Sequence, residues 1–194
     1  MTEKRLFTQE DCIETGYGMS IANKVIVLKK SSLPEECRTP SEQLYFCKGG
    51  NGSNPNPIGR SILAVSLSDG ELVRWNRSDV LGILKPELLP DFARLHLSQI
   101  RPSGALDLKS HEPEYSGYSF LPDGRYAAGV WLCNEQEVKD YIEMQKDYQH
   151  RVMICDRSDF CVFEMEQGMV IHPSRETVES HRKEQEQGGI KMGM

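Results

Sequence analysis

Basic side chains surround one tryptophan in the first half of the chain. Trp75 stands between Arg74 and Arg77 in the segment 74–77. An aromatic ring flanked by guanidinium groups can stack on a nucleic-acid base while the arginines bind phosphates. Other polar residues join this group if the neighbouring segments form a hairpin. The set that we expect to bind nucleic acid or another partner is Lys48, Asn51, Arg60, Arg74, Trp75 and Arg77.

A structural role for Trp75 is the stronger interpretation. Side chains alternate between the two faces of a strand, so Val73 and Trp75 share one face while Leu72 and Arg74 share the other. This alternation favours packing of the tryptophan in the core, with the arginines in solvent.

Carboxylates recur with helical spacing in the second half of the chain. Asp140, Glu143 and Asp147 fall on one face of a predicted helix. Residues 1–102 hold 13 Lys/Arg and 12 Asp/Glu, whereas residues 103–194 hold 10 and 17. A solvated acidic surface explains this asymmetry. The functional alternative is a partner-binding face that imitates phosphate charge and competes for an arginine-rich channel.

The segment 48–60 contains Gly49, Gly50 and Gly52, and glycines allow backbone amides to approach an anion closely. A phosphate-binding Walker loop ends in Gly-Lys-Ser/Thr and precedes a helix. Here prolines intervene and a strand is predicted to follow, so the segment is interpreted as a structured turn rather than a nucleotide site.

The sequence contains no recognisable catalytic or metal-binding pattern. Its six cysteines include no Cys-x-x-Cys pair, its five histidines are dispersed, and no serine lies in a Gly-x-Ser-x-Gly setting. We therefore predict no catalytic residue, no cofactor and no metal ligand, and a protein that is not an enzyme. An enzyme with an unrecognised site stays open, because catalytic groups assemble from distant positions.

Composition and hydropathy indicate a cytoplasmic protein without a membrane partner. No apolar run approaches the roughly 20 residues of a membrane-spanning helix. The first residues lack the apolar region and cleavage site of a signal peptide.

The order of the predicted elements favours an α+β fold with two small lobes, each a mainly antiparallel sheet with one or two covering helices. In the N-terminal lobe, residues 1–102, strands are predicted at 21–30, 43–47, 61–67 and 71–75. Asn76 is predicted to cap a helix over 77–84, and a second helix is predicted over 89–100.

A polar segment rich in Gly and Pro separates the second lobe, residues 115–172. This lobe has a ββαββ pattern, with strands at 115–121, 125–133, 151–155 and 160–165 and a helix over 134–148 that begins at Asn134. Residues 174–194 are predicted to form a charged, partly mobile tail.

Several motifs resemble small accessory proteins of conjugative elements and phages from gut Firmicutes. They are the segments 47–60, 68–71, 74–79 and 89–92, and the resemblance spans about residues 43–92. It implies an accessory gene of a mobile element, and such genes commonly antagonise host defence as antirestriction or anti-CRISPR proteins.

We therefore expect a protein that inhibits a host DNA-targeting defence nuclease, such as Cas9 or a restriction enzyme, by binding the effector, its DNA or both. The alternatives are a DNA-binding accessory module of a conjugative element and an enzyme with an unrecognised site.

Overall fold

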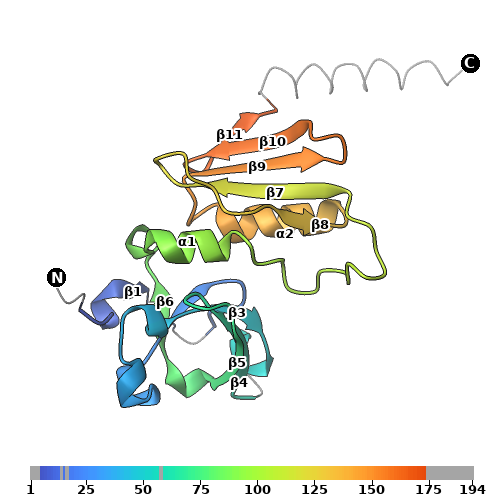
Figure 1. The fold of residues 1–194 in the computed structure, drawn as a ribbon. Coiled ribbons are helices and arrows are strands. Elements are labelled where there is room, and N and C mark those ends of the chain that lie inside the picture. The colour runs from blue at the N-terminus through green and yellow to red at the C-terminus, as the bar shows by residue number, and fades with distance from the viewer. Residues whose placement is uncertain (1–4, 14, 16–17, 57–58, 174–194) are drawn as a thin grey trace, which may run out of the picture.

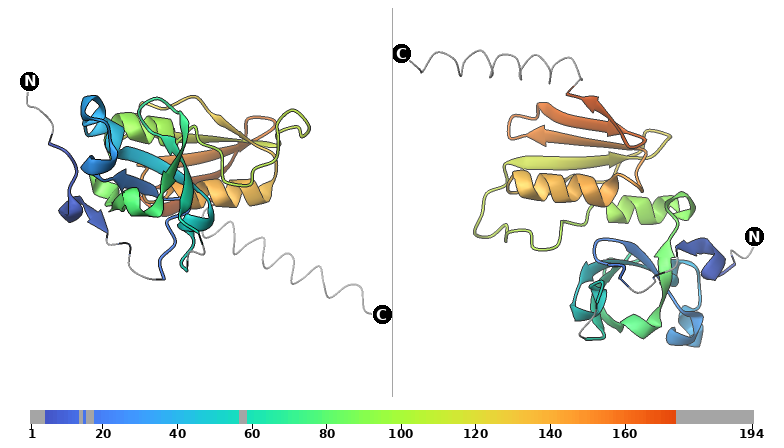
Figure 2. Two further views of the ribbon diagram at one scale, coloured as in Figure 1. Left: turned by 90° about the horizontal axis from the view of Figure 1, so that it is seen from below. Right: turned by 180° about the vertical axis from the view of Figure 1, so that it is seen from behind.

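The computed structural model describes residues 5–13, 15, 18–56 and 59–173. It contains a six-stranded and a five-stranded antiparallel sheet in two lobes, with helices α1 (Asp91–Leu97) and α2 (Glu135–Gln145) between them (Figures 1 and 2). The predicted α+β class with two lobes is confirmed. The predicted tail, residues 174–194, lies outside the described residues.

The N-terminal sheet has the strand order β1-β6-β2-β3-β4-β5 and curves around its own interior (Figure 1). Its strands are β1 (Cys12–Ile13), β2 (Val25–Leu28), β3 (Leu44–Gly49), β4 (Ser61–Ser66), β5 (Leu72–Asn76) and β6 (Val80–Leu84). Both faces of the central strands are buried. Val25 and Val27 face a core that continues under α1, whereas Ile26 and Leu28 face a second core inside the curved sheet.

The prediction of a helix over 77–84 is wrong. The backbone N–H of Asn76 does donate to Oδ2 of Asp79 (2.9 Å), so the capping signal is real. It caps only the single 3₁₀ turn Arg77–Asp79, and the chain then continues as β6. Because β6 lies between β1 and β2 and is mostly buried, its apolar residues do not alternate, and this pattern resembles that of a buried helix.

The C-terminal lobe contains the predicted strands and helix and one strand more. Its sheet has the order β11-β10-β9-β7-β8, and α2 covers one face (Figure 1). The strands are β7 (Tyr115–Phe120), β8 (Val130–Leu132), β9 (Arg151–Asp156), β10 (Cys161–Glu166) and β11 (Met169–His172). Strand β8 is shorter than predicted, and β11 at the sheet edge was not predicted. The Asn134 side chain accepts from the Glu137 N–H (2.9 Å), as expected of a helix cap.

Polar side chains of α2 and the following turn join the two lobes. The Tyr141 hydroxyl donates to the carbonyl of Ser98 (2.7 Å), and the Gln145 amide donates to the carbonyl of Leu97 (2.9 Å). The Gln149 amide likewise donates to the carbonyl of Arg94 (2.9 Å). The carbonyls of Leu97 and Ser98 lie at the C-terminal end of α1, where the last carbonyls have no partner within the helix, and the Arg94 carbonyl accepts the bond from Gln149 in addition to one from the N–H of Ser98 (3.0 Å).

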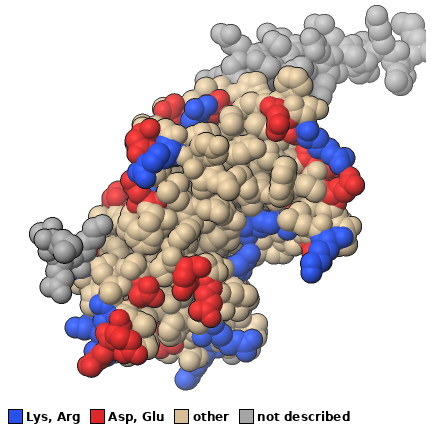
Figure 3. Space-filling model, in the orientation of Figure 1, with Lys and Arg blue, Asp and Glu red and all other residues tan. Residues whose placement is uncertain are grey.

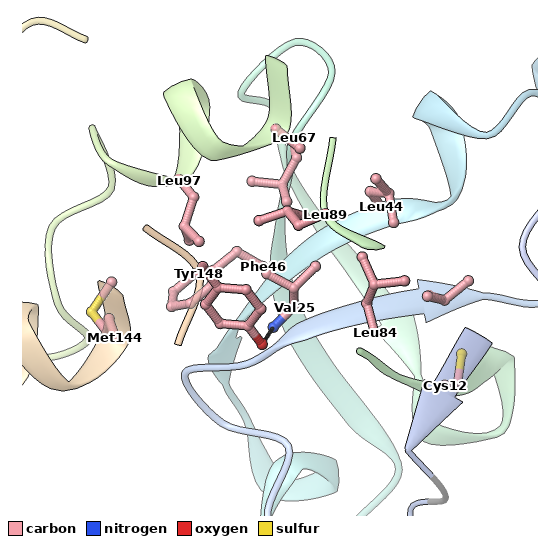
Figure 4. Packing of buried hydrophobic residues seen from close by; sticks show 12 residues of the cluster. Cys12, Val25, Leu44, Phe46, Leu67, Leu84, Leu89, Leu97, Met144 and Tyr148 are labelled. Atoms are coloured by element: carbon pink, nitrogen blue, oxygen red, sulfur yellow. Dashed lines mark hydrogen bonds between the residues drawn. The ribbon is translucent and has the colours of Figure 1, made fainter. Parts of the chain in front are cut away.

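Tyr148 also connects the lobes. Together with Met144 it packs into the N-terminal core beside Phe46 and Leu97, and its hydroxyl accepts from the backbone N–H of Val25 (3.2 Å) (Figure 4). The N-terminal core therefore includes side chains from the C-terminal lobe.

Replacing Tyr148 separates its two contributions to stability. Tyr148→Phe leaves the Val25 N–H buried without its partner, so the free energy of unfolding falls by about 1–3 kcal/mol. Tyr148→Ala also removes the ring and lowers the free energy of unfolding by about 3–5 kcal/mol. Urea unfolding measures both values. The exposed Tyr126→Phe is the control, and equal losses for all three variants would contradict this role.

Asp11 holds the start of β1 in place. Its carboxylate accepts two hydrogen bonds from the Arg5 guanidinium (2.8 and 2.9 Å) and one from the backbone N–H of Thr8 (2.8 Å). The Arg5 hydrogen bond and then the Thr8 N–H outweigh burial and lower the pKa of Asp11 to about 2. The carboxylate is therefore charged in the folded protein at neutral pH.

This pKa predicts a pH dependence of stability. The pKa of Asp11 in the folded protein lies below its usual value near 4. Its contribution to the free energy of unfolding is therefore complete above pH 4 and is lost as the pH falls toward 2. Asp11→Asn is expected to flatten the curve of unfolding free energy against pH in that window. Urea unfolding at pH 2 to 6 measures this, and a curve unchanged in the variant would refute it.

Candidate functional site

The predicted basic group divides into residues that support the fold and residues that are exposed. Lys48, near the end of β3, is half-buried, and its ammonium donates to the carbonyl of Arg101 (2.9 Å). Burial, and then the charge of Arg101, lower the pKa of Lys48. Ser103 donates to the carbonyl of Lys48. Lys48 thus anchors the segment that joins the two lobes.

Arg77 stabilises the turn that the glycines form. Its guanidinium donates to the carbonyls of Gly52 (2.9 Å) and Met19 (3.2 Å). Gly50 has a φ of +104°, and a Cβ there would lie 2.6 Å from the carbonyl oxygen of Ser61. The segment is a turn packed against β4, which requires glycine at this position.

Trp75 lies against the core, as the alternation of β5 indicates. Its ring meets Tyr45 edge to face, with 5.6 Å between centroids and 77° between planes. Arg74 is exposed on the opposite face of the strand. Asn51 and Arg60 are exposed as well. The predicted residues therefore do not form one stacking platform around the tryptophan.

The predicted acidic face of α2 and the following turn is partly neutralised by neighbouring groups. Glu143 pairs with Lys146 (2.6 Å), and Asp147 pairs with Lys24 of the N-terminal lobe (3.8 Å). Asp140 accepts from the side chain of Gln136 on the same helix (2.9 Å).

A cleft of about 580 Å³ lies where the two lobes meet. Three carboxylates line it: Glu87 and Asp91 from the N-terminal lobe and Asp147 from the turn after α2. Leu89 and Tyr148 supply apolar and aromatic surface. Of these residues only Asp147 was predicted as a site residue, because it lies more than 50 residues from Glu87 and Asp91 in the sequence.

The basic groups of this cleft have other partners. The guanidinium of Arg94 donates to the carbonyl of Pro86 (3.1 Å), and His150 lies 3.1 Å from the carboxylate of Glu166. Asp91 pairs with Arg125 (3.2 Å), but both side chains are more than half exposed, so solvent weakens this pair. The lining of the cleft therefore contains three carboxylates and one guanidinium, and Lys24 pairs with Asp147 from outside the lining (3.8 Å).

The six cysteines are free thiols, and four of them are buried. Burial raises the pKa of Cys12 to about 11 and also raises the pKa of Cys47, Cys155 and Cys161. The thiols with a raised pKa stay protonated at neutral pH and are poor nucleophiles.

Within residues 5–13, 15, 18–56 and 59–173, no group of three His, Cys, Asp or Glu side chains is arranged to hold a metal ion. In the same ranges, no helix has the length and apolar character needed to cross a membrane. Comparison with protein families, curated proteins and solved structures found no match to this chain.

On the face shown in Figure 3, Lys and Arg are interspersed with Asp and Glu over both lobes. No continuous basic belt crosses the described part of this face.

Arg77 and Arg74 should respond differently to truncation. Arg77→Ala removes the donors to Gly52 and Met19 and is expected to lower the free energy of unfolding by about 1–3 kcal/mol. Arg74→Ala removes an exposed side chain, and its effect should stay within about 0.5 kcal/mol. Urea unfolding of the two single variants measures the difference, and equal stabilities would contradict the role assigned to Arg77.

Proposed function

We propose that this protein is a non-enzymatic inhibitor of a DNA-targeting nuclease and binds the nuclease through the cleft between its lobes. The observation that carries the proposal is the set of three carboxylates, Glu87, Asp91 and Asp147, around one cavity of about 580 Å³. Nucleases hold the DNA backbone with arginine and lysine side chains. A cleft lined by several carboxylates can bind such a side chain in place of phosphate.

The way the cleft is built supports binding of a protruding basic side chain. The bonds from Gln145 and Gln149 to carbonyls of α1 fix the two walls relative to each other. Arg94 is held on the carbonyl of Pro86 and cannot extend across the cavity without breaking that bond. A preformed acidic site binds a cation without first reorganising, which preserves affinity.

Two further observations favour a protein partner over DNA. Lys48 and Arg77 are engaged with backbone carbonyls, which leaves Arg60 and Arg74 as the exposed arginines of the predicted basic group. The motifs within about residues 43–92 also resemble accessory proteins of mobile elements, for which bacterial defence nucleases such as Cas9 and restriction enzymes are the expected targets.

A cleavage assay tests the proposal. Plasmid cleavage by a purified Cas9–guide complex and by a restriction enzyme is measured with and without the protein, and each reaction is repeated with competitor DNA. Inhibition that survives the competitor is expected, because the acidic cleft binds the enzyme. Inhibition that the competitor relieves would indicate the DNA-binding alternative, and cleavage unaffected at large molar excess would refute the proposal for these nucleases.

Charge reversal locates the site. Glu87→Lys/Asp147→Lys should weaken inhibition about tenfold or more, since like charges then face the partner's basic groups. Glu36→Lys/Glu71→Lys is the matched control, because it changes the net charge equally at exposed positions outside the cleft. Equal weakening by both variants would exclude the cleft and indicate long-range charge alone.

A further inference from the structure

A second cavity, of about 610 Å³, lies on the N-terminal lobe, and its charged lining residues are basic. Lys29 and Lys30 follow β2, Arg38 follows the 3₁₀ turn Glu35–Cys37, and all three line the cavity. Its lining contains no carboxylate among the described residues. Both lysines are exposed, and no described acidic side chain lies within ion-pair distance of either.

The guanidinium of Arg38 is held in place through only some of its hydrogen-bond donors. Its Nε donates to the carbonyl of Leu33 (3.2 Å), and its Nη1 lies 3.3 Å from the exposed carboxylate of Glu35. The structure records no partner for Nη2 among the described residues. A guanidinium fixed through one edge can offer its remaining donors to an anion at little entropic cost.

An aromatic side chain belongs to the same cavity. Phe7 and Leu81 supply its apolar surface and pack against the N-terminal core. The fully buried Gln43 fixes Phe7 there: its oxygen accepts from the Phe7 N–H (2.8 Å), and its nitrogen donates to the carbonyls of Phe7 (3.3 Å) and Leu28 (3.0 Å). Because Leu28 directly precedes Lys29, this amide ties the aromatic residue to the basic rim.

We propose that the cavity lined by Phe7, Lys29, Lys30 and Arg38 binds a nucleotide with a terminal phosphate, either free or at the end of a strand. The phosphate would contact the cations: Arg38 has Glu35 beside it (3.3 Å), whereas no described carboxylate lies within ion-pair distance of Lys29 or Lys30. The base would stack on Phe7, since every base has a face that an aromatic ring can contact. Three cations around one site suit the two negative charges of a terminal phosphate better than the single charge of an internal one.

This site does not require a Walker loop, a motif that the segment 48–60 lacks. The Lys29–Arg38 region contributes side chains rather than glycine amides, so the sequence carries no phosphate-loop motif here. The site shares no lining residue with the acidic cleft. Its test measures ligand binding, whereas the test of the cleft measures nuclease inhibition.

Calorimetric titration of the full chain tests the proposal with adenosine monophosphate, adenosine and inorganic phosphate as probes. Adenosine monophosphate should bind at least about tenfold more tightly than either of the others, and its Kd should rise with salt. Adenosine binding as tightly as the nucleotide would overturn the phosphate contact. Inorganic phosphate binding as tightly would overturn the base contact, and no binding of any probe would overturn the site.

Variants localise the binding. Lys29→Gln/Lys30→Gln should weaken adenosine monophosphate binding about tenfold or more, because charge-assisted bonds to phosphate are lost. The control Lys109→Gln/Lys139→Gln removes equal charge from exposed positions outside the N-terminal lobe and should leave the Kd unchanged. Equal weakening by both double variants would refute the site. Urea unfolding verifies that each variant is folded.

Phe7→Leu should reduce the preference for the nucleotide over inorganic phosphate while preserving binding of phosphate itself. An unchanged preference would contradict stacking on Phe7. A short DNA strand with a terminal phosphate separates the two sources of the ligand. Tighter binding of the strand than of the free nucleotide supports recognition of strand ends, and the reverse order supports a free nucleotide.

Discussion

The packing of α2 and its following turn between the two lobes is the constraint on which the rest of the structure depends. A single helix would be expected to cover one sheet with an apolar face and turn its polar residues to solvent. Here Tyr141 contacts its own sheet and also bonds to the carbonyl of Ser98, while Gln145 and Gln149 bond to carbonyls of α1. Buried polar groups that are satisfied in this way fix one relative arrangement of the lobes, because any sliding would leave them without partners.

That arrangement creates the electrostatic character of the molecule. The acidic cleft exists only because Asp147, after α2, lies opposite Glu87 and Asp91 of the other lobe. The basic cavity lies within the N-terminal lobe and depends on Gln43, which joins Phe7 to the end of β2. Each cavity has one dominant sign of charge, although positive and negative side chains are interspersed on the face of Figure 3.

Several basic residues serve the architecture instead of a ligand. Lys48, Arg77 and Arg101 each donate to a backbone carbonyl outside the helices and strands: those of Arg101, Met19 and Leu106. Arg101 also pairs with the buried Glu137, which accepts from the backbone N–H groups of Leu106 and Cys133. Burial opposes the charge of Glu137, but these hydrogen bonds outweigh it and lower the pKa of the carboxyl. A cationic side chain in a sequence therefore does not by itself identify a binding surface.

The sequence determined the features that depend on near neighbours: the two antiparallel lobes, the hairpin β4–β5, the cap at Asn134 and the inward side of Trp75. It did not determine β6, because a strand buried on both faces lacks the alternation that distinguishes it from a helix. The sequence also did not indicate which arginines are structural and which are exposed, or that Glu87, Asp91 and Asp147 line one cleft. Only the tertiary structure decides such features, since hydrogen bonds and electrostatic interactions act between residues that are close in space, whatever their separation along the chain.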